Sequence, residues 1–117
     1  MDIPEQAQGD TRLQSINRIR ELLPAGDRVA AELADFFKLF GDPTRIKILL
    51  ALGPAELCVG EIAGLLGMNH SAISHQLRLL SRSGLVKPSK RGKNVYYSLS
   101  DKHIRNMLIQ AFEHIQE

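Results

Sequence analysis

The C-terminal segment of the chain contains four side chains that can bind a divalent metal ion. They form two short motifs, Asp101-x-His103 and His114-x-x-Glu117. Imidazole nitrogens and carboxylate oxygens are common ligands of zinc, and cobalt accepts the same set, whereas nickel normally prefers more ligands. The two motifs therefore predict a site for zinc, with cobalt as the alternative metal.

The spacing of the two motifs indicates how they could share one ion. Residues 101–117 are predicted to form one helix, on which His103 and His114 are eleven positions apart. They share a face within about 20° but lie about 16 Å apart along the axis, too far for metal–nitrogen bonds of about 2 Å to one ion. Two such helices packed antiparallel in a homodimer bring each motif to the other motif of the partner subunit, which gives two four-ligand sites by symmetry. The apolar stripe of this helix would form the dimer seam, and it consists of Ile104, Leu108, Ala111 and Ile115.

Simpler interpretations exist for the same residues. Asp101 can be the N-cap of the helix, and His114 and Glu117 can be exposed polar residues near its end. Cys58 is the single cysteine of the chain, and we expect it to be a small buried side chain rather than a metal ligand or a redox sensor. A site of clustered thiolates, of the kind used to sense arsenic, is therefore not expected.

A helix-turn-helix pattern lies in the middle of the chain. A helix is predicted over 56–66, with Gly67 as its left-handed C-cap, and a second helix follows from its N-cap Asn69 to about Arg82. Strands over 85–88 and 94–99 flank a basic loop, 89–93, which predicts a β-hairpin wing of two strands.

Three helices are expected upstream of this pattern. They cover 11–23, ended by Pro24, then about 27–40, then about 43–52 with Asp42 as its N-cap. The predicted fold class is α+β, mostly α: a winged helix-turn-helix with a C-terminal dimerisation helix. Residues 11–117 would form one DNA-binding and dimerisation domain, preceded by a flexible N-terminal arm at 1–10.

Basic charge is concentrated in and after the helix-turn-helix. Residues 62–100 contain six Lys or Arg and no Asp or Glu, whereas the remainder holds nine Lys or Arg and all thirteen acidic residues. This distribution indicates a surface for a polyanion such as DNA, although a solvated basic face is the simpler alternative. One polar face of the second helix would read bases in the major groove, and the wing would contact phosphate or the minor groove. The predicted contacts are Ser71, Ser74, His75, Gln76 and Arg78 on the helix and Lys90, Arg91 and Lys93 on the wing.

Several stretches resemble the ArsR/SmtB family of bacterial metal-sensing repressors, from about residue 33 to the end. They are Gly41-Asp42-Pro43-Thr44-Arg45, Glu56-Leu57-Cys58-Val59-Gly60-Glu61, Ser74-His75-Gln76-Leu77, Val95-Tyr96-Tyr97 and the two C-terminal motifs. The resemblance implies that metal binding releases operator DNA and so derepresses an efflux or sequestration gene. It also implies that the ligand His114 is linked, by its other ring nitrogen, to a backbone carbonyl near Gly84. Some relatives have a second site with Cys or His ligands in the N-terminal arm, but residues 1–57 contain neither type.

Together these features predict a homodimeric repressor that binds an imperfect inverted repeat in operator DNA and is released by zinc or cobalt. The alternative is a winged-helix DNA-binding protein that responds to another signal, with a structural metal or none. An enzyme is not expected, because a metal-dependent hydrolase needs an open coordination position and a general base, and no such arrangement is recognisable. No membrane span and no signal-peptide pattern are recognised, and with a single cysteine we expect a cytoplasmic protein.

Overall fold

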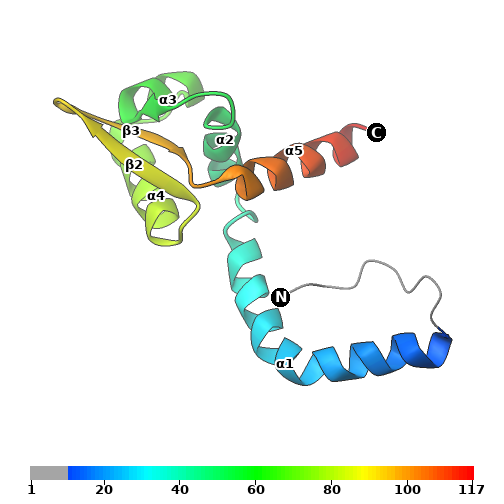
Figure 1. Cartoon of the computed structure of the whole chain (residues 1–117). Coiled ribbons are helices and arrows are strands. Elements are labelled where there is room, and N and C mark those ends of the chain that lie inside the picture. Colours follow the sequence, from blue (N-terminus) through cyan, green and yellow to red (C-terminus); the bar gives the residue numbers. More distant parts are fainter. Residues whose placement is uncertain (1–10) are drawn as a thin grey trace. The chain divides into compact units, whose positions relative to one another are not determined.

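The computed structural model describes residues 11–117, so the predicted flexible arm, residues 1–10, lies outside the described residues. The chain divides into two compact units, Met1–Phe37 and Lys38–Glu117. The elements follow one another as α1 (Arg12–Lys38), α2 (Pro43–Ala51), β1 (Leu57–Cys58), α3 (Val59–Leu66), α4 (His70–Arg82), β2 (Val86–Arg91), β3 (Asn94–Leu99) and α5 (Lys102–Gln116) (Figure 1). Within residues 11–117, no helix combines the length and the apolar character that crossing a membrane requires.

The first unit contains α1, a single helix of 27 residues. The prediction of two helices separated at Pro24 is therefore wrong. A proline inside a helix removes one backbone hydrogen bond and bends the helix, but it does not always end it, and Figure 1 shows α1 bent between its blue and its cyan part. Leu13, Ile19 and Leu23 are each more than half exposed, so this helix presents an apolar face that its own unit does not cover.

The helices of the second unit enclose an aliphatic core. The α2 helix begins where the side chain of Asp42 accepts a hydrogen bond from the backbone N–H of Arg45 at 2.9 Å, with Pro43 at the first position. Burying each large aliphatic side chain contributes about 1.5–3 kcal/mol. The side chains with no exposed surface are Ile48, Leu49, Ile62, Ile73, Leu77, Leu80 and Leu85.

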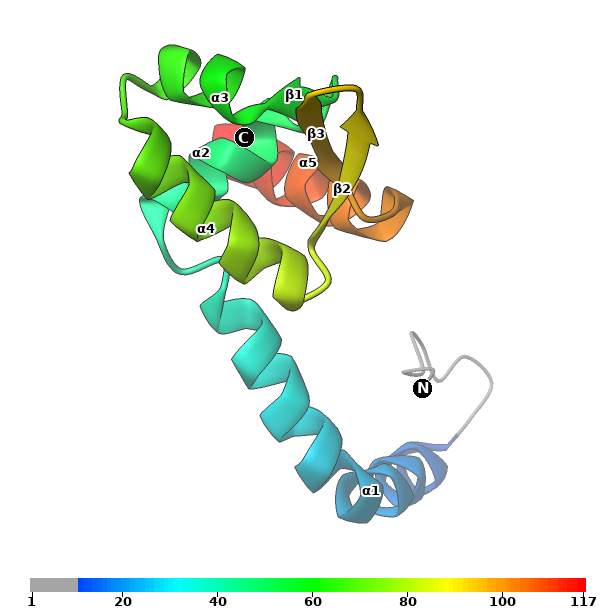
Figure 2. The same cartoon turned by 90° about the vertical axis from the view of Figure 1, so that its left-hand side faces the viewer.

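The predicted helix-turn-helix is confirmed, and Figure 2 shows α3 and α4 joined by its turn. Gly67 ends α3 with a φ of 66°, a left-handed conformation that favours glycine. The side chain of Asn69 then accepts a hydrogen bond from the backbone N–H of Ala72 at 2.8 Å and caps α4. Sequence signals for caps therefore place both ends of the turn correctly.

The start of α3 differs from the prediction, because residues 56–58 are not helical. Leu57 and Cys58 form β1 and pair with β3, and the backbone N–H of Cys58 donates to Oε1 of Glu61 at 3.0 Å as α3 begins. Cys58 is half-buried rather than buried, because it stands at this edge position between strand and helix.

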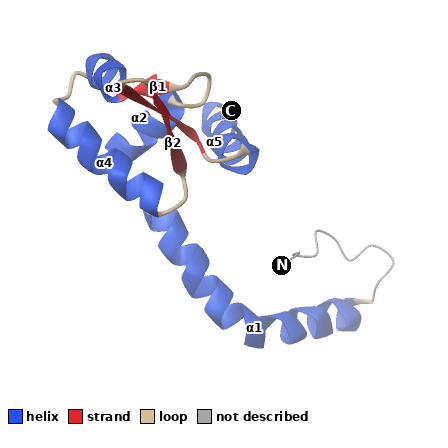
Figure 3. Ribbon diagram, turned by 60° about the vertical axis from the view of Figure 1, so that its left-hand side comes forward, coloured by secondary structure: helices blue, strands red, loops and turns tan. Residues whose placement is uncertain are grey.

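The wing is part of an antiparallel sheet of three strands in the order β1-β3-β2 (Figure 3). The predicted two-stranded wing is confirmed as the hairpin of β2 and β3, and β1 adds a third strand through the pairing of Leu57 with Tyr97. The strand β2 also runs further than predicted, since Arg91 pairs with Asn94 and only two residues remain in the turn. A two-residue hairpin turn requires positive φ, which Gly92 supplies with a φ of 61°.

Candidate DNA-binding face and metal-binding motifs

The α4 helix separates its apolar side chains from its polar ones. Ile73, Leu77 and Leu80 are fully buried against the second unit. The opposite side leaves Ser71, His75 and Arg78 exposed, with Ser74 half-buried beside them. A helix anchored on one side and polar on the other is the form that enters a major groove in winged-helix proteins. The structure thus brings four of the predicted contacts to one side of α4, and their contact with DNA stays a prediction.

The fifth predicted helix contact, Gln76, is held from behind by another helix. Nε of Arg45 in α2 donates a hydrogen bond to Oε1 of Gln76 at 3.0 Å, and both side chains are half-buried. The amide oxygen of Gln76 is therefore engaged within the protein before any DNA is bound.

The predicted contacts of the wing differ from one another in their surroundings. Lys90 and Lys93 are exposed near the hairpin turn. Arg91 instead has two partners: its Nη2 lies 2.9 Å from both carboxylate oxygens of Glu56, and its guanidinium carbon lies 5.2 Å from the centre of the Tyr96 ring. In the free protein, the guanidinium of Arg91 is already paired with the carboxylate of Glu56. To contact a DNA phosphate, Arg91 would have to leave Glu56 or bind the carboxylate and the phosphate at the same time.

The first metal-binding motif lies at the start of α5. Oδ1 of Asp101 caps the helix, accepting hydrogen bonds from the backbone N–H groups of His103 at 2.8 Å and Ile104 at 3.2 Å. The hydrogen bond from Ile104 is the largest cause that lowers the pKa of Asp101 below its usual 3.8, which keeps the carboxylate ionised. Nδ1 of His103 lies 3.4 Å from the same Oδ1, and its side chain is 79% exposed. The simpler interpretation of Asp101 as an N-cap is thus confirmed, and it leaves the imidazole of His103 open to a ligand.

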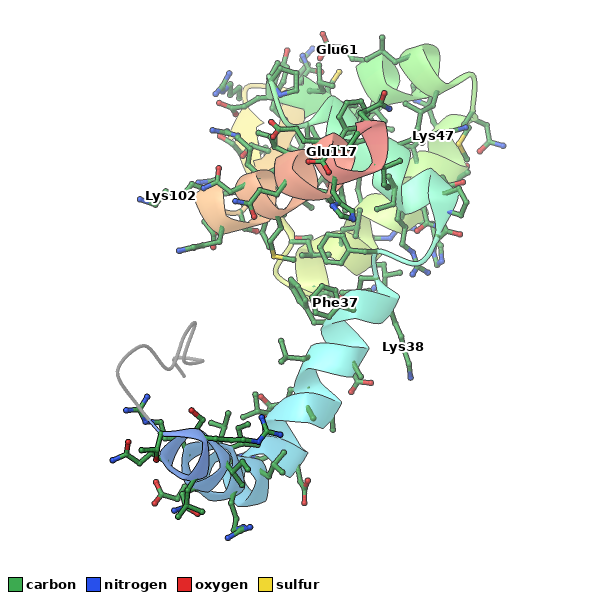
Figure 4. All side chains as sticks on the ribbon, turned by 90° about the vertical axis from the view of Figure 1, so that its right-hand side faces the viewer. Phe37, Lys38, Lys47, Glu61, Lys102 and Glu117 are labelled. Carbon is green, nitrogen blue, oxygen red and sulfur yellow. The ribbon has the colours of Figure 1, made fainter. Side chains whose placement is uncertain are left out.

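The second motif lies at the other end of α5, and Figure 4 labels Lys102 and Glu117 at these two ends. Nδ1 of His114 lies 3.9 Å from Oε2 of Glu117, and the side chains are 84% and 79% exposed. Within the described residues of one chain, no group of three or more His, Cys, Asp or Glu side chains could hold a metal ion. Each chain therefore presents two separate pairs of candidate ligands.

The spacing inside each pair can be compared with the shape of a zinc site. Two ligands of one tetrahedral zinc ion, with bonds of about 2.0–2.1 Å, lie roughly 3.3–3.4 Å apart. The distance of 3.4 Å in the Asp101–His103 pair matches this edge. The distance of 3.9 Å in the His114–Glu117 pair shortens to it by a small rotation of exposed side chains. The donor set therefore fits zinc or cobalt, provided that two pairs meet.

The apolar side chains of α5 are divided between the core and the surface. Ile104 and Leu108 are only 7% and 8% exposed, so half of the predicted dimer seam is used within the chain itself. Ile109, Phe112 and Ile115 are exposed instead. Beside Ile109 lies an apolar groove of about 280 Å³, which is lined by Leu49, Leu50, Gly53, Pro54, Leu99, Arg105, Leu108 and Ile109. The large apolar side chains of α5 that stay uncovered are thus Ile109, Phe112 and Ile115.

The predicted link between His114 and Gly84 is not formed within one chain. His114 lies beside Glu117, and Figure 1 shows the C-terminal end of α5 apart from the end of α4. The link therefore stays a prediction for the assembled protein.

Two residues that contact predicted DNA-binding side chains, Arg45 and Glu56, could not be recognised from the sequence. Arg45 lies 31 positions before Gln76, and Glu56 lies 35 positions before Arg91. Pairing across such distances depends on the fold, so no local pattern reveals it. The available signal was the complementary chemistry of the two side chains, which gains meaning only once the helices and strands are placed.

Comparison with known proteins agrees with this geometry. Residues 42–87 match the model of a bacterial regulatory protein family, the arsR family. The chain is 38% identical over 110 residues to a transcriptional repressor SmtB homolog of Synechocystis sp., covering 92% of this chain and 83% of the relative. It is 41% identical over 87 residues to a cadmium resistance transcriptional regulatory protein, CadC homolog, of Staphylococcus aureus, covering 74% of this chain and 72% of the relative.

A solved structure extends the comparison to the fold. The homodimeric winged helix-turn-helix DNA-binding domain Mb0332 of Mycobacterium bovis, a possible ArsR-family regulator, superposes with a TM-score of 0.72 at 25% identity, covering 78% of this chain and 84% of that one. The extent of these matches shows that the chain belongs to the ArsR/SmtB family of winged helix-turn-helix transcriptional regulators, which bind DNA and are not enzymes.

Proposed function

We propose that the protein is a metal-responsive repressor that binds operator DNA as a homodimer and leaves it when zinc or cobalt binds between the α5 helices of the two chains. The observation that supports this most directly is the pair of exposed half-sites on α5. Asp101 lies 3.4 Å from His103, and His114 lies 3.9 Å from Glu117, at opposite ends of one helix. Each half-site has a ligand spacing near that of zinc and lacks the other two ligands.

A second copy of the chain supplies what each half-site lacks. In an antiparallel arrangement, the Asp101–His103 pair of one chain would hold the ion together with the other motif of the partner subunit. A bound ion would supply a cross-link between the two chains. The lowered pKa of Asp101 keeps its carboxylate ionised as a ligand, and the histidines must be neutral to bind.

Two further observations support a dimer. Ile109 and Phe112 of α5 are 47% and 52% exposed, and Ile109 also lines an apolar groove. A second copy of the chain would remove such a surface from water. The relative of known structure from Mycobacterium bovis is a homodimer. Two copies related by a two-fold axis would present two α4 helices, which is why we expect the operator to be an imperfect inverted repeat.

The metal response also agrees with the relatives. The homologue from Staphylococcus aureus is a cadmium resistance regulator, and cadmium and zinc share many ligands. The histidine and carboxylate set of this chain favours zinc or cobalt over a thiophilic ion. We place the protein in the cytoplasm, where operator DNA is found.

The alternative is a DNA-binding regulator that responds to another signal. The capping role of Asp101 favours it, because the two hydrogen bonds at 2.8 and 3.2 Å explain that residue without any metal. The two functions differ in the effect of zinc on DNA affinity.

A zinc titration of the protein bound to its own upstream DNA tests the proposal. We expect zinc to release the DNA from the wild-type protein and not from His103→Ala or His114→Ala, both of which should still bind DNA. Glu117→Gln should also weaken the release of DNA by zinc. Glu113→Gln is its matched control and should respond like the wild type, since both carboxylates are exposed near the end of α5. If zinc released the His114→Ala protein from DNA as it releases the wild type, the assignment of His114 as a metal ligand would be contradicted. If zinc had no effect on DNA binding by the wild type, the regulator of another signal would be favoured.

A further inference from the structure

One face of the wing sheet carries a polar hollow of about 510 Å³. Side chains alternate between the two faces of a strand, and Val86 of β2 is buried, so the residues that alternate with it face away from the core. On that outer face lie Lys87, Ser89 and Arg91 of β2. Ser98 of β3 lies there too, because it pairs with Lys87 and directly opposite residues share a face. The hollow is lined by Glu56, Lys87, Pro88, Ser89, Arg91, Ser98, Leu99 and Arg105.

The hollow has an excess of positive charge. Three of its lining residues are basic, Lys87, Arg91 and Arg105, whereas Glu56 is the only acidic residue among them. Lys87 of β2 and Arg105 of α5 are exposed, and among residues 11–117 neither of these two side chains takes part in an ion pair. Cations that line one hollow from two elements without a carboxylate partner favour an anionic ligand.

Arg91 is held in place at this hollow and still keeps donors for a ligand. Its Nη2 lies 2.9 Å from both carboxylate oxygens of Glu56, and its guanidinium carbon lies 5.2 Å from the centre of the Tyr96 ring. A guanidinium has five N–H donors, so the contact of one nitrogen with Glu56 leaves others for a second anion. Ser89 and Ser98 add hydroxyl groups that can donate to the same anion. Charge, planar guanidinium donors and hydroxyls together are the donors that proteins use to bind phosphate.

We propose that this hollow is a binding site for a phosphate group, which Lys87 and Arg105 hold together with the free donors of Arg91. Three cations and one carboxylate leave the lining with a net charge of +2, which a phosphate dianion balances. The phosphate can belong to a free phosphorylated molecule or to the DNA backbone, since both present the same oxygens. No lining residue belongs to the two metal-binding motifs or to α4, so the inference does not rest on the metal response or on base reading.

Amide NMR spectra of the full-length protein, recorded while inorganic phosphate replaces chloride at constant ionic strength, test the site for a free ligand. We expect saturable shifts at Lys87, Ser89 and Ser98. Lys87→Gln and Arg105→Gln should each weaken phosphate binding on the order of tenfold, as expected for the loss of one charge-assisted contact. Lys90→Gln is the matched control, because Lys90 is an exposed lysine of the same strand that alternates onto the opposite face and does not line the hollow. It removes the same charge and should bind phosphate like the wild type.

DNA titrations at several salt concentrations test the other source of phosphate. If a phosphate of the DNA backbone enters the hollow, Lys87→Gln and Arg105→Gln should each reduce the slope of log affinity against log salt concentration by about one. Lys102→Gln is the control for this measurement, since Lys102 is exposed at the start of α5 and lies outside the hollow. It should keep the slope of the wild type.

Each outcome has a separate meaning. An effect of Lys87→Gln and Arg105→Gln in either measurement, without an effect of its control, supports the site and identifies the source of the phosphate. An equal effect of the control variants would mean that phosphate or DNA responds only to net charge, and it would overturn the inference. The absence of any effect in both measurements would overturn it as well. If the wild-type protein binds no DNA at all, the proposed function fails, and the phosphate titration alone decides on the hollow.

Discussion

Replacing Glu56 with glutamine would test how the wing uses its arginine. In the free protein, Nη2 of Arg91 lies 2.9 Å from both carboxylate oxygens of Glu56. A DNA phosphate would compete with this carboxylate for the same donors. Glu56→Gln keeps the size of the side chain and removes its charge, so Arg91 can bind a phosphate without giving up an ion pair. We expect the variant to bind DNA more tightly than the wild type.

The exposure of the two side chains sets the size of the effect. Arg91 is 56% exposed and Glu56 is 41% exposed, so water screens their attraction, and pairs of this kind contribute about 0.2–1 kcal/mol. A value of about 0.5 kcal/mol corresponds to a gain of about twofold for one wing, or about fourfold for a dimer with two wings. The free protein should lose the same stabilisation, which lowers its melting temperature by roughly 2–4 °C.

Fluorescence anisotropy titrations with one duplex, repeated over a range of salt concentrations, would measure the gain. The gain should shrink at high salt, because salt screens both the ion pair and the phosphate contact. In an Arg91→Ala background, Glu56→Gln should have little effect if Glu56 acts through Arg91. Weaker binding by the Glu56→Gln variant would refute the reasoning, since it would mean that the pair holds the wing in its binding shape.

Three further perturbations follow from local geometry. Gly67→Ala should lower the free energy of unfolding by about 1–2 kcal/mol, because the residue has a φ of +66°. Gly64→Ala should instead raise the free energy of unfolding by roughly 0.5–1 kcal/mol, because its added Cβ meets no atom within 4 Å. Equal shifts of the melting temperature in the two variants would contradict this difference. The charge of Asp101, whose pKa is lowered from 3.8 chiefly by the backbone N–H of Ile104, should stabilise the fold above that value and lose its effect as the pH falls through the lowered pKa. The difference in melting temperature between wild type and Asp101→Asn should therefore vanish in acid. A difference that grows in acid would contradict a stabilising role for the charge of Asp101. Zinc-induced release of DNA should fade in mildly acid solution, because His103 and His114 bind metal only when neutral, and a pH-independent response would point to other ligands.

The sequence was sufficient to predict elements that are determined by their own ends. Asp42, Gly67 and Asn69 each supply a cap whose hydrogen bond or φ value depends on a few neighbouring residues. The order of the helices around the turn could therefore be predicted without any knowledge of the fold. The two pairs of candidate ligands at the ends of α5 could be recognised in the same way, because each pair lies within a few neighbouring residues.

Features that depend on distant partners could not be predicted. The strand β1 has only two residues, and Leu57 and Cys58 are extended because they pair with Tyr97 and Tyr96, about forty positions later. Local pattern alone extends the following helix backwards over them. Pro24 led to the opposite error, since a local stop signal was overridden by a helix that continues on both sides.

The division of the apolar residues of α5 between buried and exposed positions also depends on partners that are distant in the sequence. Ile104, Leu108, Ala111 and Ile115 share one helical stripe, and periodicity cannot tell which part of a stripe faces the chain's own core. The structure buries Ile104 and Leu108 and leaves Ile115 exposed. The large apolar side chains of α5 that remain available for the contact between two chains that we propose are Ile109, Phe112 and Ile115.

The distance between the metal-binding motifs and the DNA-reading helix constrains how one could affect the other. Figure 1 shows the C-terminal end of α5 and the tip of the β2–β3 hairpin at opposite ends of the second unit. An ion held at the C-terminal end of α5 would lie apart from the tip of the wing of the same chain, so we expect it to change DNA affinity by changing how the two chains are placed relative to each other. Coupling of that kind is reciprocal: DNA must weaken zinc binding by the factor by which zinc weakens DNA binding. Zinc titrations of the free dimer and of the DNA-bound dimer should therefore differ by the same factor as the two DNA affinities, and unequal factors would mean that zinc acts through a further equilibrium, such as the association of the chains themselves.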